Sequence, residues 1–278
     1  MRMIAFSLAG IGLALLLNAS TAEAVPITFS GSGNSPAGIQ ATVDAYRADL
    51  GTLNPNVPGS FGSGRREINW DAVPDAFAAP NNLPANFFNV NSPRGVVFTT
   101  AGTGFQVSAN AVNSTSTPVL FGNINPTYPS LFQTFSPEKL FTALGSNVLD
   151  VDFLVPGGTT PALTRGFGSV FTNVTLPNTT SLTFFDANDA SLGTFFVQPG
   201  GAQSLSFLGV DFGSDVISRV EITNGNAALG PDQGPGVDLV VMDDFVYGEP
   251  ASAVPEASTL MLLAGGLLGL GLMWRHEP

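Results

Sequence analysis

The chain of 278 residues contains no cysteine and one histidine, and its single lysine is Lys139. The lack of cysteine excludes disulfide bonds and thiol catalysis. The histidine, His276, lies among the last residues, so the preceding sequence cannot build a Ser-His-Asp triad or a histidine-based metal site. It also contains no P-loop and no dinucleotide-binding glycine pattern. These absences leave carboxylates as the main groups available for chemistry.

Positive charge is scarce as well. Lys and Arg number 9 against 21 Asp and Glu, which gives a formal net charge of −12. A surface of this sign repels nucleic acid, so we expect no nucleic-acid partner. The acidic balance would favour divalent cations, although it also serves simply to keep an exported protein soluble.

Between residues 25 and 250 the chain consists of short runs rich in Val, Phe, Leu and Ile, separated by Gly, Pro, Asn, Ser and Thr. Such runs predict β-strands. Apolar and polar residues alternate in 217–223, which places Val220 and Ile222 on one buried face. We therefore predict an all-β fold, a two-sheet sandwich of jelly-roll type. The predicted strands are 95–99, 104–109, 148–155, 167–176, 181–186, 192–197, 205–212, 217–223 and 239–247.

Residues 25–94 are expected to form a loop-rich part with one short N-terminal helix, and residues 95–250 the core of the sandwich. Apolar residues recur at helical spacing through 39–50, and Gly51 follows at the place of a C-cap glycine. This pattern predicts a helix. The glycine-containing segment 31–33 is expected to be flexible.

The N-terminus has the form of a secretory signal peptide. Arg2 gives a positive start, residues 4–17 are apolar, and Ala22 and Ala24 have the small-x-small spacing of a cleavage site. We expect a signal peptidase to remove residues 1–24. An uncleaved membrane anchor is the alternative.

Residues 251–278 form a separate C-terminal tail, in which the apolar run 260–274 is followed by Arg275. As a helix, that run would rise roughly 22 Å against a bilayer core of about 30 Å. Arg275 could snorkel to the cytoplasmic face, which leaves the body outside. We therefore predict a membrane helix over 260–274, the alternative being a buried C-terminal helix of a soluble domain.

A short polar motif precedes the apolar run. It consists of Val254, Pro255, Glu256, Ser258 and Thr259. With this motif, the apolar run and Arg275, the tail resembles the C-terminal signal of the PEP-CTERM family of bacterial surface proteins. Ala257 stands where the family has a second proline. The resemblance implies recognition by an exosortase in a Gram-negative bacterium that makes exopolysaccharide, and it implies nothing about the activity of the body.

Carboxylates are the candidates for a metal site, because hard cations such as Ca²⁺ take six to eight oxygen ligands. In many jelly-roll carbohydrate-binding modules a structural calcium ties an early acidic residue to an aspartate near the last strand. Asp71, Asp243 and Asp244 hold comparable positions here. Neighbouring strand residues point to opposite faces, so at most one of Asp243 and Asp244 is expected to serve such a site, the other being solvated. Calcium is the only cofactor that the sequence suggests.

An aromatic ring could contact a glycan. Trp70 is the candidate, because it lies beside Asp71 in the loop-rich part; a buried tryptophan is the alternative. Arg65 and Arg66 could pair with an acidic polysaccharide, or they form a solvated pair in a loop. Lys139 and the glutamate before it are expected to form a solvated pair.

Together these features predict an exported, non-enzymatic protein of the cell surface or the exopolysaccharide matrix of a biofilm. It would be sorted through its tail and anchored transiently in the inner membrane. Its export partners would be signal peptidase and exosortase, and polysaccharide is the candidate ligand. One alternative is a carbohydrate-binding module with a structural calcium. The other is a glycoside-active enzyme, which needs two carboxylates at a defined separation.

Overall fold

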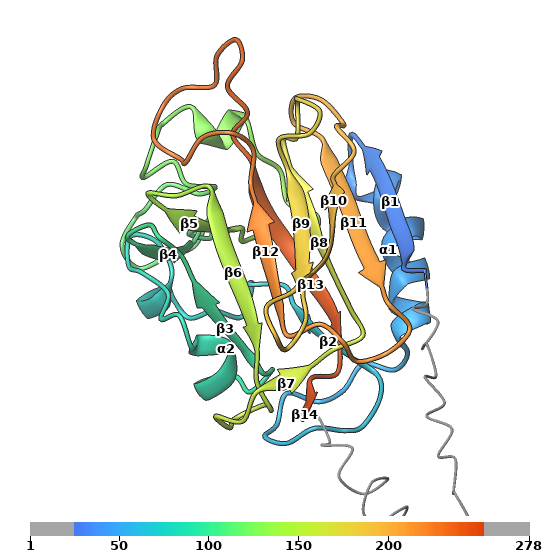
Figure 1. Ribbon diagram of the computed structural model, residues 1–278. Helices are drawn as coiled ribbons and strands as arrows, with labels where there is room; N and C mark the ends of the chain where they lie inside the picture. Colours follow the sequence, from blue (N-terminus) through green and yellow to red (C-terminus); the bar gives the residue numbers. More distant parts are fainter. Residues whose placement is uncertain (1–24, 253–278) are drawn as a thin grey trace, which may run out of the picture.

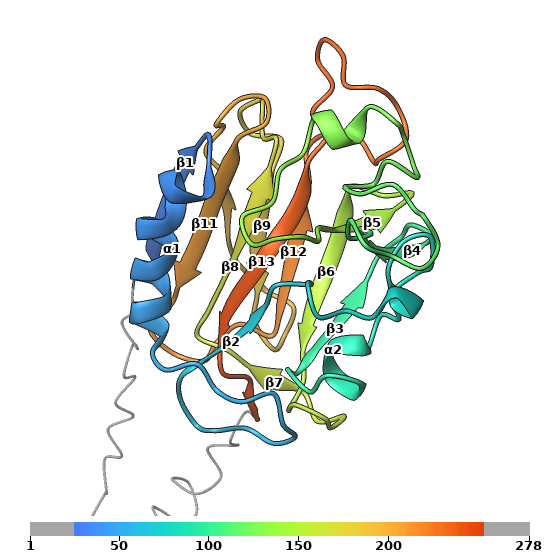
Figure 2. The same ribbon diagram turned by 180° about the vertical axis from the view of Figure 1, so that it is seen from behind.

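The computed structural model describes residues 25–252. Two antiparallel sheets pack face to face, and helix α1 (Pro36–Leu50) covers the outer side of the larger sheet (Figure 1, Figure 2). Within this part of the chain, no helix is long and apolar enough to cross a membrane. The predicted signal peptide, 1–24, and the predicted membrane helix, 260–274, lie outside the described residues.

The larger sheet has seven strands. Its main path runs in the order β1 (Ile27–Gly33), β11 (Leu205–Asp211), β8 (Gly166–Thr172), β13 (Val241–Gly248), β5 (Phe141–Leu144) and β4 (Gly104–Val107), and off this path β2 (Arg65–Ile68) pairs with β13. Strand β13 pairs with β8 along one edge. Its other edge is shared by β5, at Met242, and by β2, which begins its pairing at Phe245.

The smaller sheet has five strands, in the order β10 (Ser191–Phe196), β9 (Ser181–Phe185), β12 (Arg219–Thr223), β6 (Val148–Phe153) and β3 (Val96–Thr99). A separate pair joins β7 (Ala162–Leu163) to β14 (Ala251–Ser252). The remaining elements are α2 (Phe87–Val90) and the 3-10 turns η1 (Asp75–Phe77) and η2 (Tyr128–Ser130).

Every strand predicted from the sequence is present, with ends that differ by a few residues, and the predicted helix 39–50 is part of α1. The prediction that 31–33 is flexible is wrong, because these residues belong to β1 and pair with β11. Strands β1, β2, β5, β7 and β14 were not predicted. The mostly β, antiparallel character of the fold is confirmed, whereas the jelly-roll assignment stays a prediction.

Aromatic rings fill the space between the two sheets. Trp70, Phe98, Phe141, Phe167 and Phe245 are each at most 1% exposed. Trp70 stacks on Phe141 with ring centroids 4.1 Å apart and meets Phe245 edge-on at 5.0 Å. The core therefore holds Trp70 rigidly against the inner side of β13.

Helix α1 packs on the outer side of the larger sheet through Tyr46. The ring lies across the β8–β11 pair, where Gly168 and Gly209 face each other. A Cβ atom added at either glycine would lie 2.9 Å from the Tyr46 ring. The Tyr46 hydroxyl donates to the Val210 carbonyl at 3.2 Å. Two glycines thus allow the helix to approach the sheet closely.

Both ends of the described chain lie at the same end of the sandwich (Figure 1). Ile27, at the start of β1, pairs with Asp211 at the end of β11. At the same end, the Thr164 hydroxyl donates to the carbonyl of Gly248, the last residue of β13, at 2.8 Å. The turn η2 and the loop between β12 and β13 lie at the opposite end.

Candidate functional site

A β-bulge in β13 forms the centre of the candidate site. The register between β13 and β8 shifts between Met242 and Phe245, so Asp243 and Asp244 together face a single residue of β8. On the other edge of β13, these two aspartates fall between the part paired with β5 and the part paired with β2. The expectation that they point to opposite faces, one of them solvated, is wrong because the bulge interrupts the alternation of the strand.

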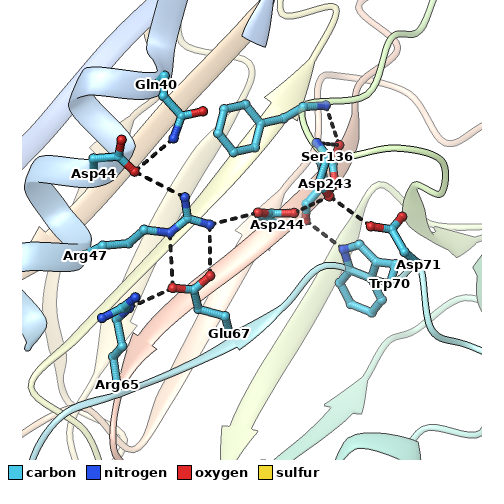
Figure 3. A network of polar contacts seen from close by, with 11 residues as sticks. Gln40, Asp44, Arg47, Arg65, Glu67, Trp70, Asp71, Ser136, Asp243 and Asp244 are labelled. Atoms are coloured by element: carbon cyan, nitrogen blue, oxygen red, sulfur yellow. Dashed lines mark hydrogen bonds and ion pairs between the residues drawn. The ribbon is translucent and has the colours of Figure 1, made fainter. Parts of the chain in front are cut away.

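The hydroxyl of Ser136 is shared by three carboxylates (Figure 3). Its Oγ lies 2.7 Å from Asp244 Oδ1, 3.3 Å from Asp243 Oδ1 and 3.3 Å from Asp71 Oδ2. A serine hydroxyl has one proton to donate, so it satisfies one of these oxygens at a time. The three aspartates that the sequence singled out are therefore brought together around a residue that it did not single out.

Backbone amides supply most of the other hydrogen bonds to the cluster. Asp243 Oδ2 accepts from the N–H of Phe135 at 2.6 Å and from that of Ser136 at 3.3 Å. Asp71 Oδ1 accepts from the N–H of Lys139 at 3.1 Å. All these donors come from the segment that precedes β5. Asp243 therefore holds this segment to the bulge, and Asp71 holds it to the loop after β2.

Burial works against ionisation of these carboxyl groups. Asp243 is 0% exposed and Asp244 is 2% exposed. Burial raises the pKa of Asp243 well above its ordinary value, and the charge of Asp244 adds to the effect. Burial also raises the pKa of Asp244 and of Asp71, although hydrogen bonds from Ser136 and from the chain oppose it. The cluster is therefore suited to hold a proton between its oxygens.

Arg47 connects the cluster to a second group of charges. Its Nη2 lies 3.2 Å from Asp244 Oδ2 and 2.8 Å from Glu67 Oε2 (Figure 3). Glu67 in turn pairs with Arg65, whose Nε lies 2.7 Å from Glu67 Oε1. The guanidinium on α1 therefore bridges β13 and β2 and offsets part of the acidic charge.

An open pocket of about 480 Å³ lies against this network. Asp244, Ser136, Arg47 and Glu67 line it, whereas Asp71 and Asp243 do not. Its volume is in the range of small-molecule sites. The carboxylate cluster thus presents one aspartate and the shared hydroxyl to the pocket and keeps its most buried member behind them.

Among residues 25–252, no three or more His, Cys, Asp or Glu side chains stand in an arrangement that could hold a metal ion. At the bulge, the Ser136 hydroxyl occupies the position between the carboxylates. A calcium ion ligated by Asp71, Asp243 and Asp244 would therefore require this hydroxyl to turn away or to become a ligand itself.

Trp70 is buried, as in the alternative interpretation of the sequence. It is 1% exposed, and its Nε1 donates to the Asp243 carbonyl at 2.7 Å. Its ring is covered by Phe141 and Phe245. Trp70 therefore supports the bulge from the core side and does not offer a ring face to a sugar.

The interpretation of two basic residues as solvated is wrong. Arg66 is 0% exposed and pairs with Glu249, because β2 carries it into the sheet. Lys139 is 2% exposed, and its Nζ contacts the Val73 carbonyl. Arg66 connects loops to the sandwich, and Lys139 connects the segment before β5 to the loop after β2.

The sequence analysis missed Ser136 and Arg47 as members of the site, and it did not connect the carboxylate of Glu67 with the three aspartates. Arg47 lies on the polar side of the predicted helix and Glu67 follows two arginines, so charge complementarity gave a weak signal for this pair. Ser136 gave none, because small polar residues occur throughout the chain.

Comparison with known proteins identifies the tail. Residues 253–276 match the PEP-CTERM protein-sorting motif, which confirms the resemblance noted from the sequence. The motif indicates an exported bacterial cell-surface protein that is sorted by an exosortase. The match does not include the body. No curated protein and no solved structure matches the chain.

Proposed function

We propose that the protein is a non-enzymatic component of the cell surface or of the exopolysaccharide matrix of a Gram-negative bacterium. A signal peptidase removes residues 1–24, the run 260–274 anchors the chain transiently in the inner membrane, and an exosortase processes the tail. The observation that carries this proposal is the sorting motif at 253–276, which follows directly after β14.

The position of the chain ends supports this proposal. Since β1 begins and β14 ends at the same end of the sandwich, a body attached through its tail would turn the opposite end outward. That end contains η2 and the loop between β12 and β13 (Figure 1). We infer that these loops face the matrix.

The state of the carboxylates supports a structural role for them. Asp243 and Asp244 are buried, and both are hydrogen-bonded to the segment before β5. Asp71 is bound to the same segment. In this arrangement the acidic groups join chain segments far apart in the sequence, a use that needs no substrate.

The proposal is tested by cell fractionation with the full chain carrying an internal epitope tag. Deletion of 253–276, or the change Pro255→Ala, is expected to reduce the surface-exposed fraction strongly. Ala257→Pro, which restores the family's second proline, is the matched control and should leave display unchanged or improved. Unchanged display after the deletion would refute the proposed sorting route.

Association with the matrix is a separate measurement. In a strain that makes no exopolysaccharide, the wild-type protein is expected to move from the matrix fraction to the medium or the cell envelope. If its distribution is the same in both strains, the protein belongs to the surface and the matrix part of the proposal is refuted.

A calcium-braced carbohydrate-binding module is the second candidate. The convergence of Asp71, Asp243 and Asp244 on one Ser136 hydroxyl favours it, because that hydroxyl has one proton for three carboxylates. Calcium would take a place that opens when the hydroxyl turns away or becomes a ligand itself. Millimolar calcium is then expected to raise the melting temperature of the wild-type protein, and the rise should vanish in Asp71→Ala and in Asp243→Ala. A melting temperature that calcium does not change refutes this candidate.

A further inference from the structure

Arg94 differs from the other arginines of the described part of the chain. Arg47, Arg65, Arg66, Arg165 and Arg219 each form an ion pair with a carboxylate. Among residues 25–252, no carboxylate pairs with Arg94; its Nη1 contacts the Ser92 hydroxyl, and its buried Nε has no hydrogen-bond partner. Its positive charge is therefore uncompensated by the protein around it.

The surroundings hold Arg94 in a fixed position. Its backbone N–H donates to the Phe88 carbonyl at 2.8 Å, and its carbonyl accepts from the Tyr247 hydroxyl at 3.0 Å. The guanidinium lies over the Phe88 ring at 5.1 Å from the centroid. Burial lowers the pKa of Arg94, and the charge of Arg66 contributes to this. An anion beside the guanidinium would relieve both effects.

Arg94 stands between two pockets. It lines the pocket of about 480 Å³ beside the carboxylate cluster and also a smaller pocket of about 230 Å³. Asn69 lines both pockets as well. A ligand group that reaches this wall meets a preorganised guanidinium and an amide side chain together.

The rest of the larger pocket is rich in groups that accept hydrogen bonds. Glu67 and Asp244 contribute carboxylate oxygens, and Gln40 and Asn56 contribute amides. Leu53, which is 50% exposed, adds an apolar surface. A fitting ligand would have one carboxylate to pair with Arg94 and several hydroxyl groups to donate to the carboxylate and amide oxygens. It would also have a compact face of C–H groups to pack on Leu53.

We propose that this pocket binds a uronic-acid residue of a polysaccharide, with the sugar carboxylate paired to the Arg94 guanidinium. Guanidinium and carboxylate form charge-assisted hydrogen bonds, and the sugar hydroxyls donate to Glu67 and Asp244. Arg47 pairs with both of these acidic residues and offsets their charge, which reduces their repulsion of the uronate. This inference rests on the proposed matrix function and names the ligand class within it.

Titration of the full chain, purified in detergent, tests this inference. The probes are the methyl glycosides of glucuronic, galacturonic and mannuronic acid, each compared with its neutral hexose counterpart. At least one uronide is expected to bind at least tenfold more tightly than its counterpart in calorimetry, with saturation transfer observed by NMR. Arg94→Gln should weaken that binding at least tenfold.

Two further variants make the test specific. Asn56→Trp fills the pocket at an exposed position, leaves Arg94 in place, and should also abolish binding. Arg219→Gln removes a paired arginine on the other sheet and should leave binding unchanged. Circular dichroism checks that each variant remains folded.

The inference is overturned if none of the three uronides binds the wild-type protein, or if a uronide binds folded Arg94→Gln or Asn56→Trp as tightly as wild type. Neither outcome affects the distribution of the protein between matrix and medium. Failure of the ligand assignment and failure of the matrix function are therefore observed in different experiments.

Discussion

Arg66 and Glu249 form an ion pair whose side chains are 0% and 1% exposed, with Nε–Oε2 and Nη2–Oε1 distances of 2.6 and 2.8 Å. The remaining donors of Arg66 reach the carbonyls of Pro55, Pro93 and Gly59. One guanidinium thus joins the loop after α1 and the segment before β3 to the end of β13.

Removal of one partner from this pair is expected to destabilise the protein severely. Arg66→Met leaves Glu249 charged and buried, which should lower the free energy of unfolding by about 3–5 kcal/mol. The double variant Arg66→Met with Glu249→Leu should recover part of that loss. Urea denaturation measures both.

Arg65→Met is the matched control for this prediction. Arg65 pairs with Glu67 on the same strand, and both side chains are 17% exposed. Its loss should cost about 1 kcal/mol or less, because partly solvated pairs contribute little. Equal losses in Arg65→Met and Arg66→Met would contradict the role assigned to the buried pair.

The close packing of α1 on the sheet gives a second prediction. Gly209→Ala places a Cβ atom 2.9 Å from the Tyr46 ring, which cannot move because it is 0% exposed. The overpacking should cost about 1–3 kcal/mol of stability. Gly234→Ala is the control, because a Cβ atom there meets nothing within 4 Å. A thermal melt in which the two variants behave alike would disprove the packing argument.

The buried carboxylates give the protein a predictable response to pH. Because burial raises the pKa of Asp243, the folded state holds this proton more tightly than the unfolded state does. The stabilisation that the folded state gains from this bound proton is complete below the unfolded pKa of about 3.9. It is lost as pH rises through the folded pKa. Asp243→Asn removes this titrating group. The difference in free energy of unfolding between variant and wild type should therefore favour the variant more at pH 7 than at pH 4.

Asp186 provides a control of opposite sign. Hydrogen bonds from the Ala190 and Asn188 amides lower its pKa, so it contributes stability above its unfolded pKa and loses it as pH falls. Asp186→Asn should remove that contribution and shift the pH profile in the other direction. If Asp243→Asn and wild type have parallel stability profiles between pH 4 and 7, Asp243 does not titrate as described.

The loops at the end opposite to the tail are predicted to depend on Asp238. This residue is 0% exposed, and its carboxylate accepts from the Thr175 N–H at 2.9 Å and from the Thr179 hydroxyl. Asp238→Ala leaves these donors without an acceptor, which should cost about 1–3 kcal/mol. Hydrogen exchange should accelerate in residues 173–180 and not in α1. Unchanged exchange in that segment would show that Asp238 does not hold the loops.

Local patterns predicted local structure well. The helix was predictable because its apolar residues and Gly51 lie within one continuous segment, and the strands were predictable where apolar runs are long enough. Strand β2 begins with two arginines and β1 ends in alternating serine and glycine, so neither has a clear strand pattern. They form because β13 offers an edge to β2 and β11 offers an edge to β1.

The candidate site was predictable only in part, because its geometry depends on pairing between segments far apart in the sequence. Asp71, Asp243 and Asp244 were selected by residue type and position along the chain, and they do lie together. The bulge that turns both adjacent aspartates to one side depends on pairing with β8, and no local pattern encodes that pairing. The burial of Arg66 likewise depends on Glu249, which lies 183 residues further along the chain.

The place of β13 within its sheet has a mechanical consequence. The C-terminal tail continues from β14, which follows β13, and β13 is hydrogen-bonded on both edges. Tension applied through the tail would first peel β14 from β7 and would then act along the axis of β13. Its hydrogen bonds to β8 and β2 would share that force along two edges, whereas an edge strand such as β1 is held along one edge only. A tail held at the cell surface would thus pull on a strand that resists extraction.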